Sequence, residues 1–176
     1  QTVISGDFPT VVSPNPEEPA ALDMAIRKAK EVDADIVMAS DPDADRMGIA
    51  VKNDKGEWIL VNGNQTCMMF TYYILRRRHE LGLLKGKEFM VKTIVTTEIM
   101  KDICNHYNTP LLDCYTGFKW IAAVEAEREA KGVGTYVFGL EESYGYKVET
   151  EVMDKDGVSA AAMCAEMTMY WRSQGK

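Results

Sequence analysis

The sequence is short of basic residues and has no long apolar run. Its 176 residues include 20 Lys and Arg against 27 Asp and Glu, which gives a formal net charge of −7 at pH 7. Such a charge excludes a protein whose main task is to bind a nucleic-acid backbone. No stretch approaches the roughly 20 apolar residues that a membrane-spanning helix needs, so we expect no membrane partner. The first residues also lack the basic and apolar regions of a signal peptide.

Cysteine and histidine are too sparse for the common metal and disulfide frameworks. The four cysteines are scattered with no Cys-x-x-Cys pair, and the two histidines are His79 and His106. Zinc sites and disulfide scaffolds need several such residues at regular spacings. The Gly86-Lys87 pair lacks the Gly-rich stretch that precedes the lysine of a nucleotide-binding P-loop. We therefore expect no zinc, reduced thiols and a cytoplasmic location.

The composition that remains is that of a globular protein, with 46% apolar and 27% charged residues. Apolar residues recur either at helical spacing or in short runs that are typical of strands. Pro and Glu residues before the first helical pattern suit a first helical turn, and the segment 53–56 suits a hairpin turn. The patterns predict helices over residues 20–32, 64–78, 97–107, 118–131 and 158–172, and strands over residues 9–13, 35–39, 47–51, 58–61, 89–95, 110–114 and 135–138.

This alternation of helix and strand predicts an α/β fold. We expect two similar three-layer α/β/α domains with mixed, mostly parallel sheets. The continuous apolar run at residues 35–39 predicts a strand that is buried on both faces. The glycine-containing segment 81–87 predicts a connection, so that the two domains comprise residues 1–87 and 88–176.

The most informative motif, Ser-Asp-Pro-Asp-Ala-Asp-Arg, directly follows the strand predicted at residues 35–39. It places Asp41, Asp43 and Asp45 at alternate positions, so that three carboxylates can point to one place at the end of a strand, where α/β proteins bind ligands. Because three neighbouring carboxylates repel one another, a hard divalent cation with oxygen ligands, such as Mg²⁺, suits them. Arg46 can hold a phosphate or orient a carboxylate.

Other interpretations of this loop differ in how well they fit. A solvated acidic turn is the simplest, because Asp and Pro are turn formers. A calcium-binding EF-hand loop requires Gly and Glu where Arg46 and Lys52 stand, so that interpretation fails. A phosphatase of the haloacid-dehalogenase type, with Asp41 as nucleophile, matches the Asp-x-Asp spacing but not Ala44 and Asp45. The phosphatase remains as an alternative.

Three further segments carry groups that can bind a ligand. Gly-Leu-Glu-Glu-Ser-Tyr-Gly-Tyr at residues 139–146 combines carboxylates, a hydroxyl and aromatic rings, which suit a sugar. Thr-Gly-Phe-Lys at residues 116–119 places a glycine and a lysine at a predicted helix start, which suits an anion such as phosphate. Asp-Lys-Asp-Gly at residues 154–157 is by itself a turn with a helix N-cap. Ordinary polar loops are the alternative at each position.

Taken in their order along the chain, the four motifs resemble those of the α-D-phosphohexomutases, and among these the phosphoglucomutase branch. The family has an Asp-x-Asp-x-Asp-Arg magnesium loop, a Thr-Gly-aromatic-Lys loop, a Gly-x-Glu-Glu-Ser sugar loop and a Lys-Asp-Gly segment. The resemblance implies a chain that corresponds to domains two and three of a four-domain enzyme. It also implies Mg²⁺ on Asp41, Asp43 and Asp45, and roles for Arg46 and Lys155 in catalysis. The implied substrate-binding residues are Thr116, Gly117, Lys119, Glu141 and Ser143.

The resemblance also indicates what lies outside this chain. The phosphorylated serine of domain one and the phosphate-binding loop of domain four are absent, and the chain begins with Gln1 rather than Met. We expect a fragment that is inactive alone and that needs domains I and IV of the same polypeptide to act on a sugar phosphate. Phe118 and Tyr146 stand where some relatives have His, which favours glucose phosphates. Mannose or pentose phosphates, and a non-catalytic sugar-phosphate or cation-binding module, are the alternatives.

Overall fold

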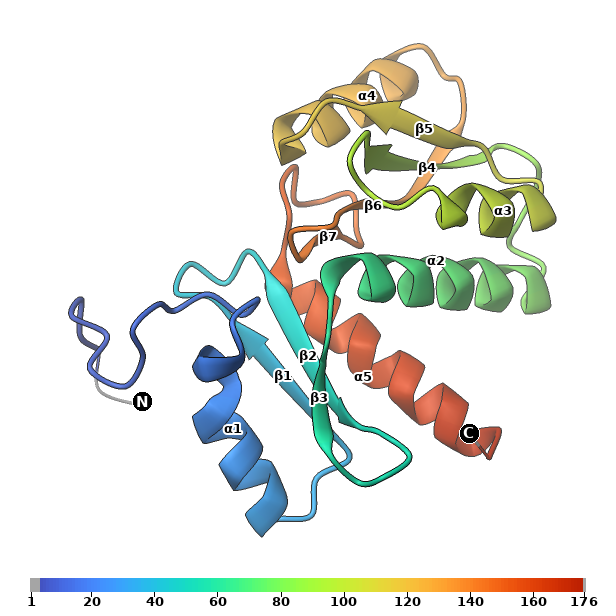
Figure 1. Ribbon diagram of the computed structural model, residues 1–176. Helices are drawn as coiled ribbons and strands as arrows, with labels where there is room; N and C mark the ends of the chain where they lie inside the picture. Colours follow the sequence, from blue (N-terminus) through green and yellow to red (C-terminus); the bar gives the residue numbers. More distant parts are fainter. Residues whose placement is uncertain (1–3, 176) are drawn as a thin grey trace.

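The computed structural model describes residues 4–175, in which two sheets and their helices alternate along the chain (Figure 1). Proline at the start of the first helix and the capping box of Asn62 with Gln65 at the second set where these helices begin. In chain order the elements are α1 (Pro19–Glu31), β1 (Ile36–Ser40), β2 (Met47–Lys52), β3 (Trp58–Val61), α2 (Gly63–Glu80), β4 (Glu88–Thr93), α3 (Ile99–His106), β5 (Leu111–Cys114), α4 (Phe118–Ala130), β6 (Thr135–Glu141), β7 (Gly145–Lys147) and α5 (Gly157–Ser173).

The first sheet has the order β1-β2-β3, and both of its strand pairs are antiparallel. The α/β class is confirmed, but the expected mostly parallel arrangement is wrong for this half. The connections of β2 to its neighbours are too short for the crossover that parallel strands require. Leu22 and Ala29 of α1 pack on one face with Val37 and Ala50, and α5 packs on the other.

Two strand predictions in this half are also corrected. The strand β1 is not buried on both faces, because it lies at the edge of its sheet and Met38 is 37% exposed. Residues 9–13, predicted as a strand, form turns and irregular backbone instead. Pro9 in the segment and Pro14 directly after it have no backbone N–H to donate to a sheet, which disfavours a strand here.

The second sheet is mixed, with the order β5-β4-β6-β7. The strand β4 pairs in parallel with both β5 and β6, whereas the short β7 pairs antiparallel with β6. The sheet therefore agrees with the predicted mostly parallel arrangement, although β7 had not been predicted. Helix α4 covers one face through Phe118 and Ile121, and α2 and α3 cover the other.

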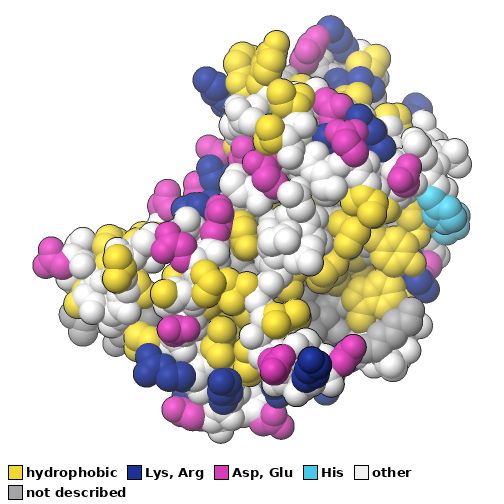
Figure 2. Space-filling model, viewed as in Figure 1, with side chains coloured by type: hydrophobic (Ala, Val, Ile, Leu, Met, Phe, Trp, Pro, Cys, Tyr) yellow, Lys and Arg dark blue, Asp and Glu magenta, His cyan; other side chains and the backbone are white. Residues whose placement is uncertain are grey.

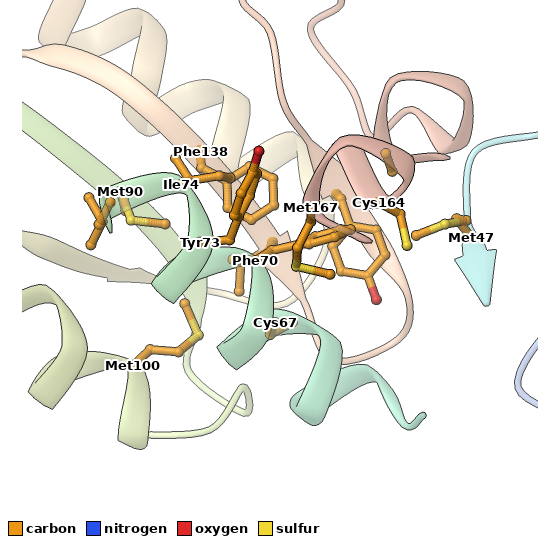
Figure 3. Packing of buried hydrophobic residues seen from close by; sticks show 14 of the residues in the cluster. Met47, Cys67, Phe70, Tyr73, Ile74, Met90, Met100, Phe138, Cys164 and Met167 are labelled. Carbon is orange, nitrogen blue, oxygen red and sulfur yellow. The ribbon is translucent and has the colours of Figure 1, made fainter. Parts of the chain in front are cut away.

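The two sheets share one apolar core, to which α2 and α5 contribute. Phe70 of α2 lies edge-on against Phe138 of β6, and Met167 of α5 and Met47 of β2 belong to the same buried cluster (Figure 3). The boundary at residues 87 and 88 stays a prediction. The packing crosses it, because α2 precedes the boundary but covers the second sheet, and α5 follows it but covers the first.

The other general expectations concern thiols and membranes. All four cysteines are free, and three of them are buried. Burial raises the pKa of Cys104 to about 12 and that of Cys164 to about 11, as is usual for thiols in an apolar environment. No helix between residues 4 and 175 is both long and apolar enough to cross a bilayer.

A lysine, Lys92, is completely buried in the second sheet. Its Nζ lies 2.9 Å from Glu98 Oε1 and 2.8 Å from Asp113 Oδ1, and it also donates to the carbonyl oxygens of Thr93 and Thr96. Four oxygen partners compensate for the loss of water around the ammonium group. The turn that follows β4 is therefore built around this side chain.

The substitution Lys92→Met is expected to lower the free energy of unfolding by about 2 kcal/mol, because it leaves the carbonyl oxygens of Thr93 and Thr96 without their donor. Chemical denaturation followed by circular dichroism measures this loss. Lys101→Met is the matched control, since Lys101 contacts the same two carboxylates from a position that is 43% exposed. We expect the control to unfold at nearly the wild-type denaturant concentration, and equal losses in both variants would contradict the role of burial.

Candidate functional site

The predicted metal loop, residues 41–46, connects β1 to β2 at the end of their ladder, where Ser40 faces Met47. Ala44 adopts a left-handed conformation, and its N–H donates to the carbonyl of Asp41 at 3.1 Å. This turn brings Asp41, Asp43 and Asp45 together, with one carboxylate oxygen of each within 4.8 Å of the others. The structure thus places the three predicted ligands around one point.

Arg46 binds Asp41 through two hydrogen bonds. Its backbone N–H donates to Oδ1 at 3.1 Å, and its Nε donates to Oδ2 at 2.6 Å. Burial opposes ionisation of Asp41, but these bonds outweigh it and lower the pKa of the carboxyl below its usual value. Asp41 is therefore a carboxylate with a fixed orientation.

Two residues that the sequence analysis did not assign to the site also contact Arg46. Its guanidinium lies 3.3 Å from Asn15 Oδ1 and 3.4 Å from Glu17 Oε1, both in the segment that leads into α1. The Ser-Pro-Asn-Pro sequence there suggests a turn, but nothing in it indicates a contact with a residue some 30 positions later. The guanidinium of Arg46 is therefore contacted by the metal loop on one side and by the segment before α1 on the other.

Lys155 joins the second half of the chain to the metal loop. Its Nζ lies 2.9 Å from Asp45 Oδ2 and 5.9 Å from the centre of the Phe118 ring. Burial raises the pKa of Asp45, and the nearby Asp41 carboxylate acts in the same direction, while Lys155 partly compensates. The site therefore holds negative charge in excess, with Arg46 and Lys155 as its cationic neighbours.

The predicted sugar loop begins at the end of β6, where Glu141 is nearly buried. Its Oε1 accepts a hydrogen bond from the backbone N–H of Gly117 at 3.0 Å, so the structure brings these two predicted residues together. Burial raises the pKa of Glu141, and the bond from Gly117 opposes this. Ser143 is half-buried, and its hydroxyl makes no hydrogen bond within the described chain.

The metal loop and the sugar loop touch through their backbones. Arg46 forms an isolated antiparallel bridge with Gly145, and the N–H of Met47 donates to the carbonyl of Tyr144 at 3.1 Å. In Figure 2, acidic and basic side chains gather at the concave left edge of the molecule, where these loops approach each other in Figure 1. The two halves therefore present their candidate residues on one side.

The segment before α5 lies against the metal loop as well. The N–H of Gly157 donates to the carbonyl of Ala44 at 2.9 Å, and a Cβ at this position would lie 2.7 Å from that oxygen. Asp156 caps α5 by accepting bonds from the N–H groups of Val158 and Ser159, as its motif predicts. This close contact places Lys155 beside Asp45.

The remaining predicted residues lie at the edge of the site. Thr116 and Lys119 are exposed, and the Nζ of Lys119 lies 5.3 Å from the ring centre of Trp120. Tyr146 is completely buried and stacks on Phe138, so it contributes to the core rather than to a ligand surface. Phe118 is nearly buried beneath Lys155.

The ion pair of Lys155 with Asp45 competes with any cation in the loop. Lys155→Met is therefore expected to tighten binding of Mn²⁺, used as a spectroscopic probe, by about fivefold, the size of effect given by one partly solvated charge. Electron paramagnetic resonance titration measures the affinity. The matched control is Lys52→Met, since Lys52 also lies 2.9 Å from a carboxylate, that of Asp33, but at the opposite end of β2. Weaker Mn²⁺ binding in Lys155→Met would contradict the competition.

Comparison with known proteins agrees with this geometry. Residues 1–56 match the model of phosphoglucomutase/phosphomannomutase alpha/beta/alpha domain II, and residues 62–174 match that of domain III. The chain belongs to the phosphoglucomutase/phosphomannomutase family. The predicted resemblance to this family is thereby confirmed. The second match begins next to α2, the helix that packs on the second sheet.

Relatives within the family carry different names. A probable phosphomannomutase of Haemophilus influenzae is 36% identical over 97% of this chain and 33% of its own length. A phosphoribomutase of Saccharomyces cerevisiae is 37% identical over 94% of this chain and 27% of its own, and a phosphoglucomutase of Staphylococcus epidermidis is 32% identical over 97% and 30%. The chain thus spans about a third of the length of the curated relatives it matches.

Solved structures of the family have the same fold. A phosphoglucomutase/phosphomannomutase family protein from Burkholderia thailandensis matches with a TM-score of 0.67 at 24% identity, over 92% of this chain and 31% of that one. An N-acetylphosphoglucosamine mutase from Aspergillus fumigatus, in complex with GlcNAc-6P and magnesium, matches with a TM-score of 0.57 at 13% identity, over 77% and 30%. At these identities the structures support the fold alone.

Proposed function

We propose that this chain is the metal- and sugar-binding middle of a phosphoglucomutase, which interconverts glucose 1-phosphate and glucose 6-phosphate. The reaction would proceed through a bisphosphorylated sugar and a phosphorylated serine. That serine would come from domain I, and a further phosphate contact from domain IV, of the same polypeptide. On this proposal the chain alone does not turn over substrate.

The observation that carries the proposal is the contact between the metal loop and the sugar loop. The bridge of Arg46 with Gly145 and the ion pair of Lys155 with Asp45 join parts of the chain that are about 100 residues apart. A mutase needs both groups at one place, because the phosphate is transferred while the sugar is held. A cation-binding module would need no such juxtaposition with a sugar loop.

The donor set fits Mg²⁺. Three carboxylates supply oxygen ligands within 4.8 Å of one another, and oxygen is the ligand that Mg²⁺ prefers. Asp41, Asp43 and Asp45 would hold the ion, which would supply positive charge to neutralise a phosphoryl group. The Aspergillus fumigatus mutase, which has the same fold, is itself a complex with magnesium.

The other side chains would bind and orient the substrate. Arg46, fixed by Asp41, would keep its guanidinium beside the phosphoryl group as a permanent positive charge. Lys155 would contact phosphate or hold a proton, and Glu141 and Ser143 would accept and donate hydrogen bonds to sugar hydroxyls. The backbone N–H of Gly117 already serves Glu141, so Thr116 and Lys119 would be the phosphate contacts of their loop.

Glucose is the substrate that the sequence favours. Neither Phe118 nor Tyr146 supplies the imidazole that some relatives carry at these positions, and both side chains are buried. The relatives named phosphomannomutase, phosphoribomutase and phosphopentomutase make mannose and pentose phosphates the alternatives. A cytoplasmic location, inferred from the reduced thiols, also stays a prediction.

The phosphatase alternative is less compatible with the geometry. The loop has Ala44 and Asp45 where the phosphatase motif has other residues, and Asp45 joins Asp41 and Asp43 as a third carboxylate within 4.8 Å. Family membership also favours transfer between sugar positions over release of phosphate.

One assay separates these proposals. The chain and the complete polypeptide are given glucose 1-phosphate, mannose 1-phosphate or ribose 1-phosphate, together with Mg²⁺ and catalytic glucose 1,6-bisphosphate. We expect glucose 6-phosphate from the complete polypeptide and no product from the chain. Faster turnover of ribose or mannose phosphate would assign that sugar as the substrate instead of glucose. Free phosphate released by the chain would show that it is a phosphatase rather than part of a mutase.

A further inference from the structure

The two adjacent glutamates of the sugar loop have different partners. Glu141 reaches Gly117, as described above, whereas Glu142 reaches the turn that follows β4. Neighbouring residues at the end of a strand point to opposite sides, which explains the divergence. The two carboxylates therefore make separate contacts, Glu141 with the loop before α4 and Glu142 with the turn after β4.

The carboxylate of Glu142 is bound by two buried hydroxyls. Its Oε2 accepts hydrogen bonds from Thr96 Oγ1 at 2.9 Å and from Thr93 Oγ1 at 3.2 Å. In the other direction, the backbone N–H of Glu142 donates to Thr96 Oγ1 at 3.2 Å. Thr96 thus holds both the side chain and the backbone of Glu142. Hydrogen bonds to a charged acceptor are among the stronger ones in proteins.

The threonines are themselves fixed in place. Lys92, completely buried, donates to the carbonyl oxygens of both Thr93 and Thr96. The N–H of Thr97 donates to Asn64 Oδ1 at 2.9 Å, which attaches the same turn to α2. The turn is consequently attached both to Lys92 of β4 and to α2.

On its other side the sugar loop lies directly on α2. A Cβ at Gly63 would lie 1.6 Å from the carbonyl oxygen of Glu142, so the backbone of Glu142 occupies the space that a side chain would need. The hydroxyl of Tyr144 donates to the carbonyl of Val61 at 3.2 Å, just before this helix. The loop is thus confined between the turn after β4 and the start of α2.

From these contacts we infer that Glu142 is a positioning residue. Held by Thr93 and Thr96, it fixes the backbone that carries Glu141 and Ser143, and it does not itself bind the sugar. The inference rests on the proposed function, in which Glu141 and Ser143 contact the substrate. It adds residues of the turn after β4, far from the four motifs in sequence, to the machinery of the site.

The variant Thr96→Val tests this inference, because it removes one buried hydroxyl and leaves Glu142 intact. In the complete polypeptide we expect kcat/KM for glucose 1-phosphate to fall about tenfold, as for the loss of one charge-assisted hydrogen bond. Mn²⁺ affinity should stay unchanged, since the metal loop is not altered. The conservative variant Thr96→Ser should restore wild-type kinetics. Thr109→Val is the matched control, because Thr109 is also a buried threonine with a hydroxyl bond, to the carbonyl of Tyr107.

A double variant then assigns the effect to one pair. Glu142→Ala combined with Thr96→Val should lose less than the sum of the two single losses, because the bond between the Thr96 hydroxyl and the Glu142 carboxylate is removed by either change. If Thr96→Val has wild-type kinetics while Glu142→Ala is impaired, Glu142 binds the sugar directly and the inference is wrong. Additive losses would overturn it as well.

Amide hydrogen exchange in the chain itself makes the result independent of catalysis. Thr96→Val should accelerate exchange about tenfold at Met47, whose N–H donates to the carbonyl of Tyr144 in the sugar loop, and Thr96→Ser and Thr109→Val should not. If the complete polypeptide has no mutase activity, the proposed function fails, whereas faster exchange still supports positioning. Unchanged exchange with an active enzyme overturns positioning and leaves the proposed function standing. Should Thr96→Val fail to fold, Glu142→Gln is measured in the same way.

Discussion

Asp43→Asn is expected to lower mutase turnover of the complete polypeptide by about a thousandfold or more, because metal-assisted charge neutralisation is the main catalytic requirement of phosphoryl transfer. Asp43 is the most informative of the three aspartates. Within residues 4–175 it makes no hydrogen bond or ion pair, so the substitution removes a charge without breaking a contact. By comparison, a change at Asp41 or Asp45 would also release Arg46 or Lys155.

Measurements on metal binding and turnover together test this prediction. Mn²⁺ binding to the chain, followed by electron paramagnetic resonance, should weaken in Asp43→Asn, and the unfolding transition should remain that of the wild type. Asp54→Asn, in the exposed turn between β2 and β3, is the control with the same change of charge. Turnover near the wild-type rate with Asp43→Asn would remove the metal assignment from this loop.

Glu141→Gln is expected to lower kcat/KM for glucose 1-phosphate by about a hundredfold. A site that binds sugar hydroxyls is expected to lose about this much kcat/KM when a charged acceptor becomes neutral and one of its hydrogen bonds is lost. Glutamine retains an oxygen for the N–H of Gly117, so the loop should keep its conformation. The loss is therefore expected to come from the substrate rather than from the fold.

The substrate dependence of this variant is the decisive measurement. Removing a sugar hydroxyl from the substrate should reduce turnover by the wild type far more than by Glu141→Gln, because the variant has already lost the contact. Glu151→Gln, at an exposed position after β7, serves as the matched control. Equal losses for the deoxy substrate in wild type and variant would show that Glu141 does not bind that hydroxyl.

Local patterns in the sequence predicted most elements and the metal loop. The helices and nearly all strands lie within a few residues of their predicted ranges, because apolar periodicity reflects which face of an element is covered. Asp41, Asp43 and Asp45 follow β1 in the sequence, so a common site at its end required no knowledge of packing. Asp156 likewise caps α5, as its position before the last helical pattern indicated.

The hairpin of β2 and β3 was predicted, but the antiparallel pairing of β1 with β2 was not, although a signal was present. Six residues join β1 to β2, and a hairpin turn joins β2 to β3, which leaves no room for a crossover helix. The alternation of helices and strands in the whole chain had suggested mixed, mostly parallel sheets, and only the hairpin turn at residues 53–56 had indicated an antiparallel pair. Connection length decides strand direction more reliably than the average pattern does.

The sequence by itself determined the α/β class, the order of the elements and the four motifs, because these depend on residues that are close along the chain. Only the tertiary structure decided which motifs meet. It brought Lys155 into an ion pair with Asp45 and Arg46 into a backbone bridge with Gly145. It also buried Tyr146 in the core and attached Glu142 to Thr96 by a hydrogen bond. Such contacts join residues that are tens of positions apart, and they arise because α2 and α5 bring the two sheets around one apolar core.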